Sequence, residues 1–279
     1  MKEFLLRSLT AIVYVIILLF PLFFNENLFY VVGFACSLIL VYEFVRLVSN
    51  YNHKFLSSDS GKSNLLLYLT FPLYISLFIL SSNWVLQSIF LTIIIATNLI
   101  LGISLFKNKF FSFSILKNRF IGHFYLVGSL VILFSMTTIS SEYNPNYLFC
   151  FLCLIWISDS ASYLFGVNFG KRPLFKSVSP KKSIEGFIGG IIFSILLSIF
   201  FYNYLYIEIE LLQWIFLGVL VTSTGAIGDL VQSQFKREAG VKDSGKWLPG
   251  HGGLYDRMDS IIFAAPFVYL TYKIYLNVS

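Results

Sequence analysis

One segment near the C-terminus concentrates residue types that suit a phosphorylated substrate. Residues 242–259 read KDSGKWLPGHGGLYDRMD, so aspartates, cations, a histidine and glycines gather inside an otherwise apolar chain. Carboxylates without soft ligands suit a hard cation such as Mg²⁺, which in proteins also takes waters and phosphate oxygens. Glycines such as Gly250, Gly252 and Gly253 let backbone N–H groups approach an anion closely. The segment therefore predicts contact with a metal-bound polyphosphate.

The carboxylates and cations around this segment have separate expected roles. Asp256 and Asp259 are three residues apart, so they share one face if a helix begins here, and Asp229 and Asp243 can fold back toward them. The cations that would neutralise phosphate charge are Lys236, Arg237, Lys242, Lys246 and Arg257. His251 stands between glycines, where it would donate to a phosphate or carry a proton. The alternative for a lone histidine is a structural role.

A second cluster, SPKKSIEG at residues 179–186, precedes another apolar run. Pro180 disfavours helix at the residue before it and indicates a turn, and Ser183 can be the N-cap of a helix that starts there. A helix N-terminus offers free N–H groups to a phosphate, and Lys181 and Lys182 add positive charge. An ordinary pair of cations at a membrane surface explains the two lysines equally well.

Three carboxylates interrupt the apolar runs, where ionisable groups are costly and usually functional. Glu43 lies near the end of its run and could reach water, so simple snorkelling competes with a functional role. Asp159 and Asp229 have no cation beside them in the sequence. Each needs a partner from elsewhere in the fold or a metal ion, and a structural hydrogen bond is the alternative.

The elements that must position these groups are membrane-spanning helices. The 279 residues are 57% hydrophobic and 12% charged, whereas a soluble domain carries about 25% charged residues. A span takes about 20 apolar residues as a helix. We therefore expect an all-α, polytopic integral membrane protein with about nine transmembrane helices. Their approximate limits are 5–24, 28–48, 64–82, 85–106, 120–140, 147–166, 184–203, 211–230 and 258–276.

The loop cations predict the orientation, because Lys and Arg concentrate on the cytoplasmic side of a membrane. With this set of spans and the N-terminus inside, all of the 20 Lys and Arg residues except Lys273 fall on the inside. The C-terminus is then outside. We expect an N-terminal transmembrane scaffold over residues 1–140 and a catalytic transmembrane region over 141–279, with cytoplasmic loops at 167–183 and 231–257.

Several other classes of protein do not fit. The motifs GxxxxGK[ST] and GxGxxG are absent, so there is no P-loop and no dinucleotide fingerprint. Cys150 and Cys153 form a CxxC without a second pair or a nearby histidine, which favours packing over a metal site. The net charge of +6 is explained by the loop cations, so no nucleic-acid partner is expected.

These motifs resemble one known family. The run S-x-x-K-R-x₄-K-D-x₇-H-G-G-x₂-D-R-x-D, from Ser233 to Asp259, resembles the signature of the phosphatidate cytidylyltransferases, the CDP-diacylglycerol synthases. SPKKSIEG is similar to the family's SPKKTxEG, with Ser183 in place of Thr. DSASYLFG is similar to its DxxAYxxG, with Ser162 in place of Ala. The resemblance is strong over about residues 150–279, and the first half resembles the family in hydropathy and in an Arg7/Thr10 pairing.

The resemblance implies that CTP and phosphatidate give CDP-diacylglycerol and pyrophosphate, with Mg²⁺ as cofactor, a second cation left open, and a homodimer. The implied metal ligands are Asp229 and Asp256, followed by Asp243 and Asp259. The implied catalytic residues are Lys236, Arg237, Lys242, Asp243, His251, Asp256, Arg257 and Asp259. The implied substrate-binding residues are Asp159, Tyr163, Ser179, Lys181, Lys182, Ser183, Glu185, Ser233, Gly252 and Gly253.

Two other functions fit parts of the pattern. A CTP-dependent lipid or polyprenol kinase would share the basic loops and the aspartates, and a non-enzymatic membrane transporter would share the intramembrane carboxylates. The complete signature run disfavours the kinase, and the concentration of charge at one face disfavours the transporter. Because CTP is cytosolic, we expect the active site on the cytoplasmic face. The compact length of 279 residues predicts a bacterial cytoplasmic membrane, with an organelle membrane as the alternative.

Overall fold

The computed structural model describes residues 2–51, 84–106, 121–140, 142–205, 207–245, 247–250 and 252–278. The expected span 64–82 lies outside these residues, as do Lys246 and His251. The chain divides into two compact units. The first unit consists of residues 1–135 and 235–259, and the second of residues 136–234 and 260–279.

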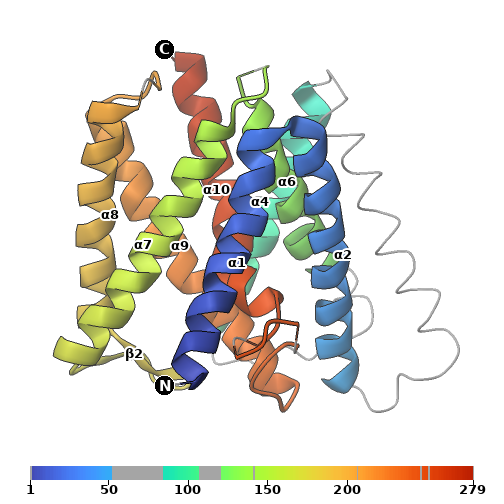
Figure 1. The fold of residues 1–279 in the computed structure, drawn as a ribbon, viewed down its shortest axis with the longest axis vertical. Helices are drawn as coiled ribbons and strands as arrows, with labels where there is room; N and C mark the ends of the chain where they lie inside the picture. Colours follow the sequence, from blue (N-terminus) through green and yellow to red (C-terminus); the bar gives the residue numbers. More distant parts are fainter. Residues whose placement is uncertain are drawn as a thin grey trace, which may run out of the picture. The chain divides into compact units, whose positions relative to one another are not determined.

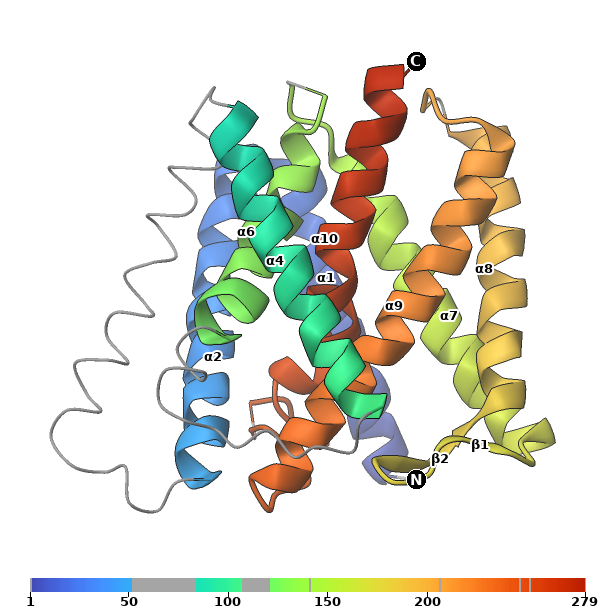
Figure 2. The same cartoon turned by 180° about the vertical axis from the view of Figure 1, so that it is seen from behind.

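In the first unit, helices α1 (Lys2–Phe24) and α2 (Glu26–Tyr51) form a hairpin that turns at Asn25 (Figure 1). Asn25 caps α2, because its Oδ1 accepts the N–H of Leu28 at 3.2 Å. Helix α4 (Trp84–Phe106) packs along a π-helical segment, η1 (Ile121–Gly128), that continues into α6 (Ser129–Ser135) (Figure 2). The expected spans 5–24, 28–48 and 85–106 are therefore confirmed as helices.

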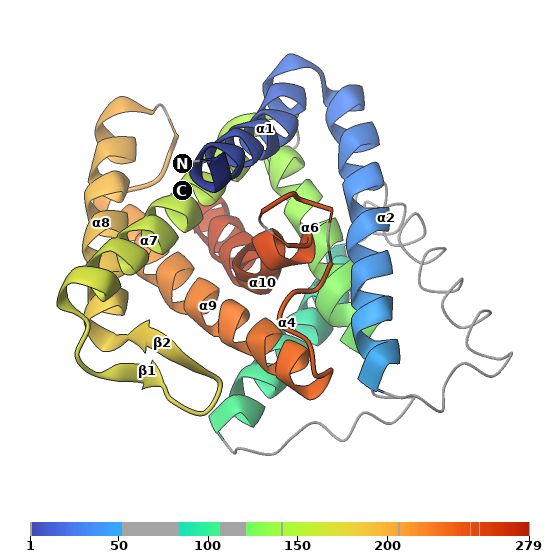
Figure 3. The ribbon, with the colours of Figure 1, turned by 60° about the horizontal axis from the view of Figure 1, so that its bottom comes forward.

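In the second unit, helices α7 (Pro145–Phe169) and α8 (Ile184–Tyr204) pack along each other. A short 3₁₀ turn, η2 (Met136–Thr138), precedes them. The chain between α7 and α8 forms a two-stranded antiparallel hairpin, β1 (Pro173–Phe175) and β2 (Ser179–Ser183), in which Pro173 pairs with Ser183 (Figure 3). The all-α expectation did not include this hairpin. The turn at Pro180 was also wrong, because residues 179–183 are a strand and the turn lies at 176–178.

Helix α8 shows why an apolar helix can pack in this unit. One of its faces exposes large side chains, Ile188, Ile192 and Leu196, as expected for a surface that meets lipid. Its other face buries small residues, which let neighbouring helix backbones approach closely in membrane proteins. On that face the hydroxyl groups of Ser194 and Thr222 lie 2.7 Å apart and join α8 to α9 by a hydrogen bond.

Helices α9 (Leu211–Glu238) and α10 (Tyr255–Val278) each contribute residues to both units. Helix α9 continues two turns beyond the expected end of its span at residue 230. Ser233, Lys236 and Arg237 therefore lie on a helix and not in the loop expected at 231–257. The residues between α9 and α10, together with both helix ends, belong to the first unit.

Six helical segments are long and apolar enough to cross a membrane, among the residues that the structure describes. They are Glu26–Leu47, Trp84–Phe106, Ile121–Thr138, Pro145–Phe169, Ile184–Tyr204 and Leu211–Glu238. The protein is thus a mostly helical integral membrane protein. The count of nine spans, the orientation and the division near residue 140 stay predictions.

Candidate functional site

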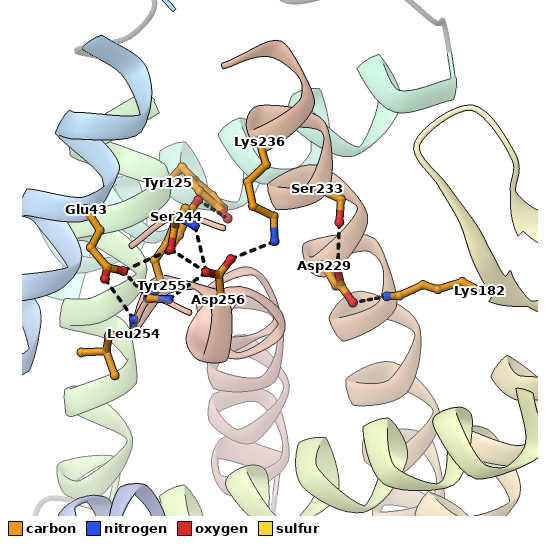
Figure 4. A network of polar contacts seen from close by, with 11 residues as sticks. Glu43, Tyr125, Lys182, Asp229, Ser233, Lys236, Ser244, Leu254, Tyr255 and Asp256 are labelled. Carbon is orange, nitrogen blue, oxygen red and sulfur yellow. Dashed lines mark hydrogen bonds and ion pairs between the residues drawn. The ribbon is translucent and has the colours of Figure 1, made fainter. Parts of the chain in front are cut away.

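A polar cluster in the second unit joins Lys182, Asp229 and Ser233 (Figure 4). The Lys182 ammonium forms an ion pair with the Asp229 carboxylate. Ser233, one turn further along α9, donates its hydroxyl hydrogen to Asp229 Oδ1 at 3.1 Å. The Lys182 and Asp229 side chains are 29% and 32% exposed, so water screens their attraction. Asp229 therefore has the partner that its place in an apolar run requires, and it stays accessible to a ligand.

The N-terminus of α8 is built as the sequence predicted. Ser183 is the N-cap residue in an extended conformation, and its hydroxyl accepts the N–H of Gly186 at 3.0 Å. Glu185, in the first turn, accepts the N–H groups of Lys171 and Arg172 at 3.0 and 3.2 Å. Glu185 thus fastens the start of the β-hairpin to α8, a structural contact that the sequence did not indicate.

The other candidates in the second unit are exposed or half-buried. Asp159 and Tyr163 are exposed and lie four residues apart on α7, so they share one face of that helix. Lys181 is exposed on β2, and Ser179 is half-buried at the start of the same strand. Their roles in substrate binding stay predictions.

A second polar cluster, in the first unit, surrounds Asp256 in the first turn of α10 (Figure 4). Asp256 Oδ1 accepts a charged hydrogen bond from Lys236 Nζ at 2.8 Å. Its Oδ2 lies within hydrogen-bond distance of the Ser244 N–H, the Ser244 hydroxyl and the Gly253 N–H, at 2.9, 3.0 and 2.9 Å. The Lys236 and Asp256 side chains are only 15% and 7% exposed. Both oxygens of this carboxylate are therefore engaged by the protein.

The electrostatics of Asp256 follow from these partners. The residue precedes the expected span of 258–276. Burial raises the pKa of its carboxyl, but the Lys236 charge and the hydrogen bonds from Lys236, Gly253 and Ser244 together outweigh burial. The pKa of Asp256 therefore lies below its ordinary value, and the group is a carboxylate at neutral pH.

Glu43, on α2, belongs to the same cluster. Its Oε1 accepts the Leu254 N–H at 3.1 Å, and its Oε2 accepts the Tyr255 N–H at 2.8 Å. The Ser244 hydroxyl lies 3.2 Å from Oε2. Glu43 is 1% exposed, so it does not reach water, and the snorkelling interpretation of this residue is wrong. A carboxylate in a long apolar run was the signal that could have identified it.

The glycines of the signature already have acceptors for their N–H groups within the protein. Gly252, at φ +87°, exchanges two backbone hydrogen bonds with Leu248, which closes a tight turn. A Cβ at Gly252 would lie 2.8 Å from Asp256 Oδ2 and 3.4 Å from Asp243 Cβ, so these two aspartates flank it. The Gly253 N–H is bound by Asp256. That these N–H groups bind a substrate phosphate stays a prediction.

The remaining candidates of the first unit differ in exposure. Arg237, Lys242, Asp243 and Arg257 are exposed. Asp259 is 9% exposed and lies on α10 with Asp256, which confirms the predicted helix start. Over the described residues, no three His, Cys, Asp or Glu side chains come together to hold a metal ion by themselves. That one or two of these carboxylates bind Mg²⁺, with waters and phosphate oxygens completing its shell, stays a prediction.

The structure is that of a helical membrane protein with carboxylates and cations gathered at helix ends. The chain matches the model of the Cytidylyltransferase family over residues 5–275, and it belongs to that family.

Curated relatives match about half of the chain. A phosphatidate cytidylyltransferase of Bacillus subtilis (strain 168) is 41% identical over 128 residues, which are 46% of this chain and 48% of the relative. A protein of the same name from Staphylococcus aureus (strain COL) is 44% identical over 128 residues, 45% of this chain and 48% of the relative. One from Staphylococcus saprophyticus is 42% identical over 126 residues, again 45% and 48%. The matched stretch thus spans about half the length of these relatives.

Proposed function

We propose that this protein is a phosphatidate cytidylyltransferase that transfers CMP from CTP to phosphatidate, giving CDP-diacylglycerol for phospholipid biosynthesis. The observation that carries the proposal is membership of the Cytidylyltransferase family over residues 5–275. The relatives named phosphatidate cytidylyltransferase support the choice of acceptor.

In the proposed reaction a phosphate oxygen of phosphatidate attacks the α-phosphorus of CTP. A new phosphorus–oxygen bond forms, the bond from the α-phosphorus to the oxygen that bridges to the β-phosphorus breaks, and pyrophosphate leaves with that bonding pair. Phosphoryl-type transfer needs mainly positioning and charge stabilisation from the protein. The cations in the two clusters and the exposed cations can supply that charge stabilisation.

The proposed cofactor is Mg²⁺, held by oxygen ligands drawn from Asp229, Asp243, Asp256 and Asp259. When bound, it would neutralise phosphate charge. Of the cations, Lys236 holds Asp256 in place, and the exposed Arg237 and Lys242 are free to move toward phosphate oxygens. The Lys182 ammonium can likewise bind a phosphate of CTP or of the lipid head group.

The proposed setting is a bacterial cytoplasmic membrane, with the active site on the cytoplasmic face and the protein as a homodimer. A membrane-embedded enzyme suits phosphatidate, whose acyl chains stay in the bilayer while its head group lies at the interface. Six apolar helices of membrane-spanning length, among the described residues, support the membrane location.

The test uses purified protein in detergent with phosphatidate, Mg²⁺ and CTP labelled separately at the α- and γ-phosphates. The proposal expects the α-label in the lipid and the γ-label in pyrophosphate. Transfer of the γ-label to the lipid would instead identify a kinase. If neither label moves while a related enzyme assayed in parallel is active, cytidylyl transfer is refuted and transport of a labelled solute becomes the next assay.

A further inference from the structure

The first turn of α10 is held by a carboxylate from a distant helix. Glu43 on α2 accepts the N–H groups of Leu254 and Tyr255, from 211 and 212 residues away in the sequence. Leu254 immediately precedes α10 and Tyr255 begins it, so both N–H groups lie at the end of the helix where its N–H groups lack acceptors of their own and carry partial positive charge. A carboxylate at 1% exposure needs such compensation, because burying an uncompensated charge is strongly unfavourable.

Glu43 is coupled to Asp256 through one side chain. The Ser244 hydroxyl lies 3.2 Å from Glu43 Oε2 and 3.0 Å from Asp256 Oδ2. A hydroxyl has a single hydrogen, so the Ser244 hydroxyl lies between the two carboxylates and shares that hydrogen between them. The Ser244 N–H also donates to Asp256. A displacement of Glu43 would therefore move a residue that supplies two of the donors around Asp256 (Figure 4).

Gly245 and the signature glycine Gly253 leave the space that Glu43 occupies. A Cβ at Gly245 would overlap the Glu43 carboxylate, and a Cβ at Gly253 would overlap both that carboxylate and the Ser244 hydroxyl. The sequence pattern predicted that Gly250, Gly252 and Gly253 let a substrate anion approach. At Gly253, and also at Gly245, the anion that comes close is a carboxylate of the protein itself.

The residue after Glu43 holds both ends of the same segment. The Phe44 ring packs edge-on against Phe235, at the end of α9, with centroids 6.2 Å apart. It packs in the same way against Tyr255, at the start of α10, at 6.0 Å. Edge-to-face pairs of this kind add stability beyond the area that they bury. Residues 43 and 44 of α2 thus fasten the segment 235–256 at its two ends.

We propose that Glu43 is a positioning residue, whose carboxylate holds Ser244, Gly245 and residues 252–256 in the arrangement that cytidylyl transfer requires. This inference rests on the proposed function. Glu43 does not need to touch substrate, because it acts through Ser244 and through the backbone of the first turn of α10. This role of Glu43 also explains why residues 245 and 253 are glycines without invoking ligand binding.

The test compares Glu43→Gln with a matched control, Ser37→Ala. Ser37 lies on the same helix and is 1% exposed, and within the described part of the chain its hydroxyl donates to the Gly33 carbonyl of α2 at 2.8 Å. For Glu43→Gln we expect a fall in kcat of about tenfold or more, equivalent to about 1.4 kcal/mol, with the KM for phosphatidate unchanged. Hydrogen exchange of the backbone at residues 244–256 should be faster by about the same factor. Ser37→Ala should change neither quantity.

A second pair of variants tests the contact itself. Gly245→Ala should impair turnover, and adding Glu43→Asp, which is shorter by one methylene, should restore part of it because the overlap is relieved. Neither variant depends on Glu43→Gln being stable enough to purify.

The outcomes separate the two proposals. A kcat for Glu43→Gln within twofold of wild type, exchange equal to that of Ser37→Ala, or no rescue of Gly245→Ala would each overturn the positioning role. A wild-type protein without cytidylyl transfer would overturn the proposed function. The exchange measurement would still decide whether Glu43 holds the segment.

Discussion

The Lys236–Asp256 ion pair allows a prediction whose size follows from its burial. Removing one partner of a fully buried pair costs about 3–5 kcal/mol, whereas an exposed pair contributes about 0–1 kcal/mol. These side chains are 15% and 7% exposed, which places the pair close to the buried limit. Asp256 keeps neutral donors from Ser244 and Gly253. For Lys236→Met we therefore expect a loss of about 2–3 kcal/mol in the free energy of unfolding at pH 7.

The loss should depend on pH in a defined direction. In the wild type the pKa of Asp256 is held below its ordinary value, so the ionised group contributes stability above about pH 3.9, the pKa in the unfolded chain. That contribution is lost as the pH falls through the lower native pKa. Without Lys236, the charge and the hydrogen bond that most oppose burial are lost, so the pKa of Asp256 should be higher in the variant than in wild type. The difference in unfolding free energy between wild type and Lys236→Met should become smaller below the pKa of Asp256 in the variant. It should vanish in strong acid, where Asp256 is protonated in both proteins.

The assay is equilibrium unfolding in mixed detergent micelles at a series of pH values. Lys242→Met is the matched control, because Lys242 is an exposed cation of the same segment and surface substitutions usually change stability by less than about 0.5 kcal/mol. Equal stability of the two variants at pH 7 would refute the structural role of the pair. If the loss of unfolding free energy in Lys236→Met stays constant down to strong acid, the loss does not come from the ion pair with Asp256.

Three further changes test single contacts. Ser183→Ala should lower stability by about 1 kcal/mol through loss of the α8 cap, and Ser183→Thr should restore most of it; thermal unfolding in detergent measures both. Lys182→Met should change stability by less than about 1 kcal/mol, because the Lys182–Asp229 pair is about a third exposed. The same variant should turn over CTP more slowly than wild type. Turnover equal to that of wild type would argue against a role of Lys182 in catalysis. Gly252→Ala should destabilise the protein by about 1–2 kcal/mol, because Gly252 has φ +87° and a Cβ there would lie 2.8 Å from Asp256 Oδ2. A melting temperature equal to that of wild type would contradict this expectation.

Local features of this protein were readable from the sequence because their causes are local. Apolar runs of membrane-spanning length became the described helices, since hydrocarbon demands internally satisfied backbone hydrogen bonds. Ser183 was identifiable as a cap because its partner, the Gly186 N–H, is three residues away. The start of α10 was placed near Asp256 and Asp259 for a similar reason. The composition of the signature also indicated phosphate chemistry.

The tertiary structure decided which anion each donor meets. A helix N-terminus or a glycine-rich turn attracts any negative group, so the sequence could not distinguish a substrate phosphate from a carboxylate of the protein. The fold brings Glu43 to the N–H groups of Leu254 and Tyr255, Asp256 to that of Ser244, and Glu185 to the start of the hairpin. Partners such as Glu43 and Tyr255 meet only when helices pack, because no pattern of neighbouring residues records a contact across 212 positions.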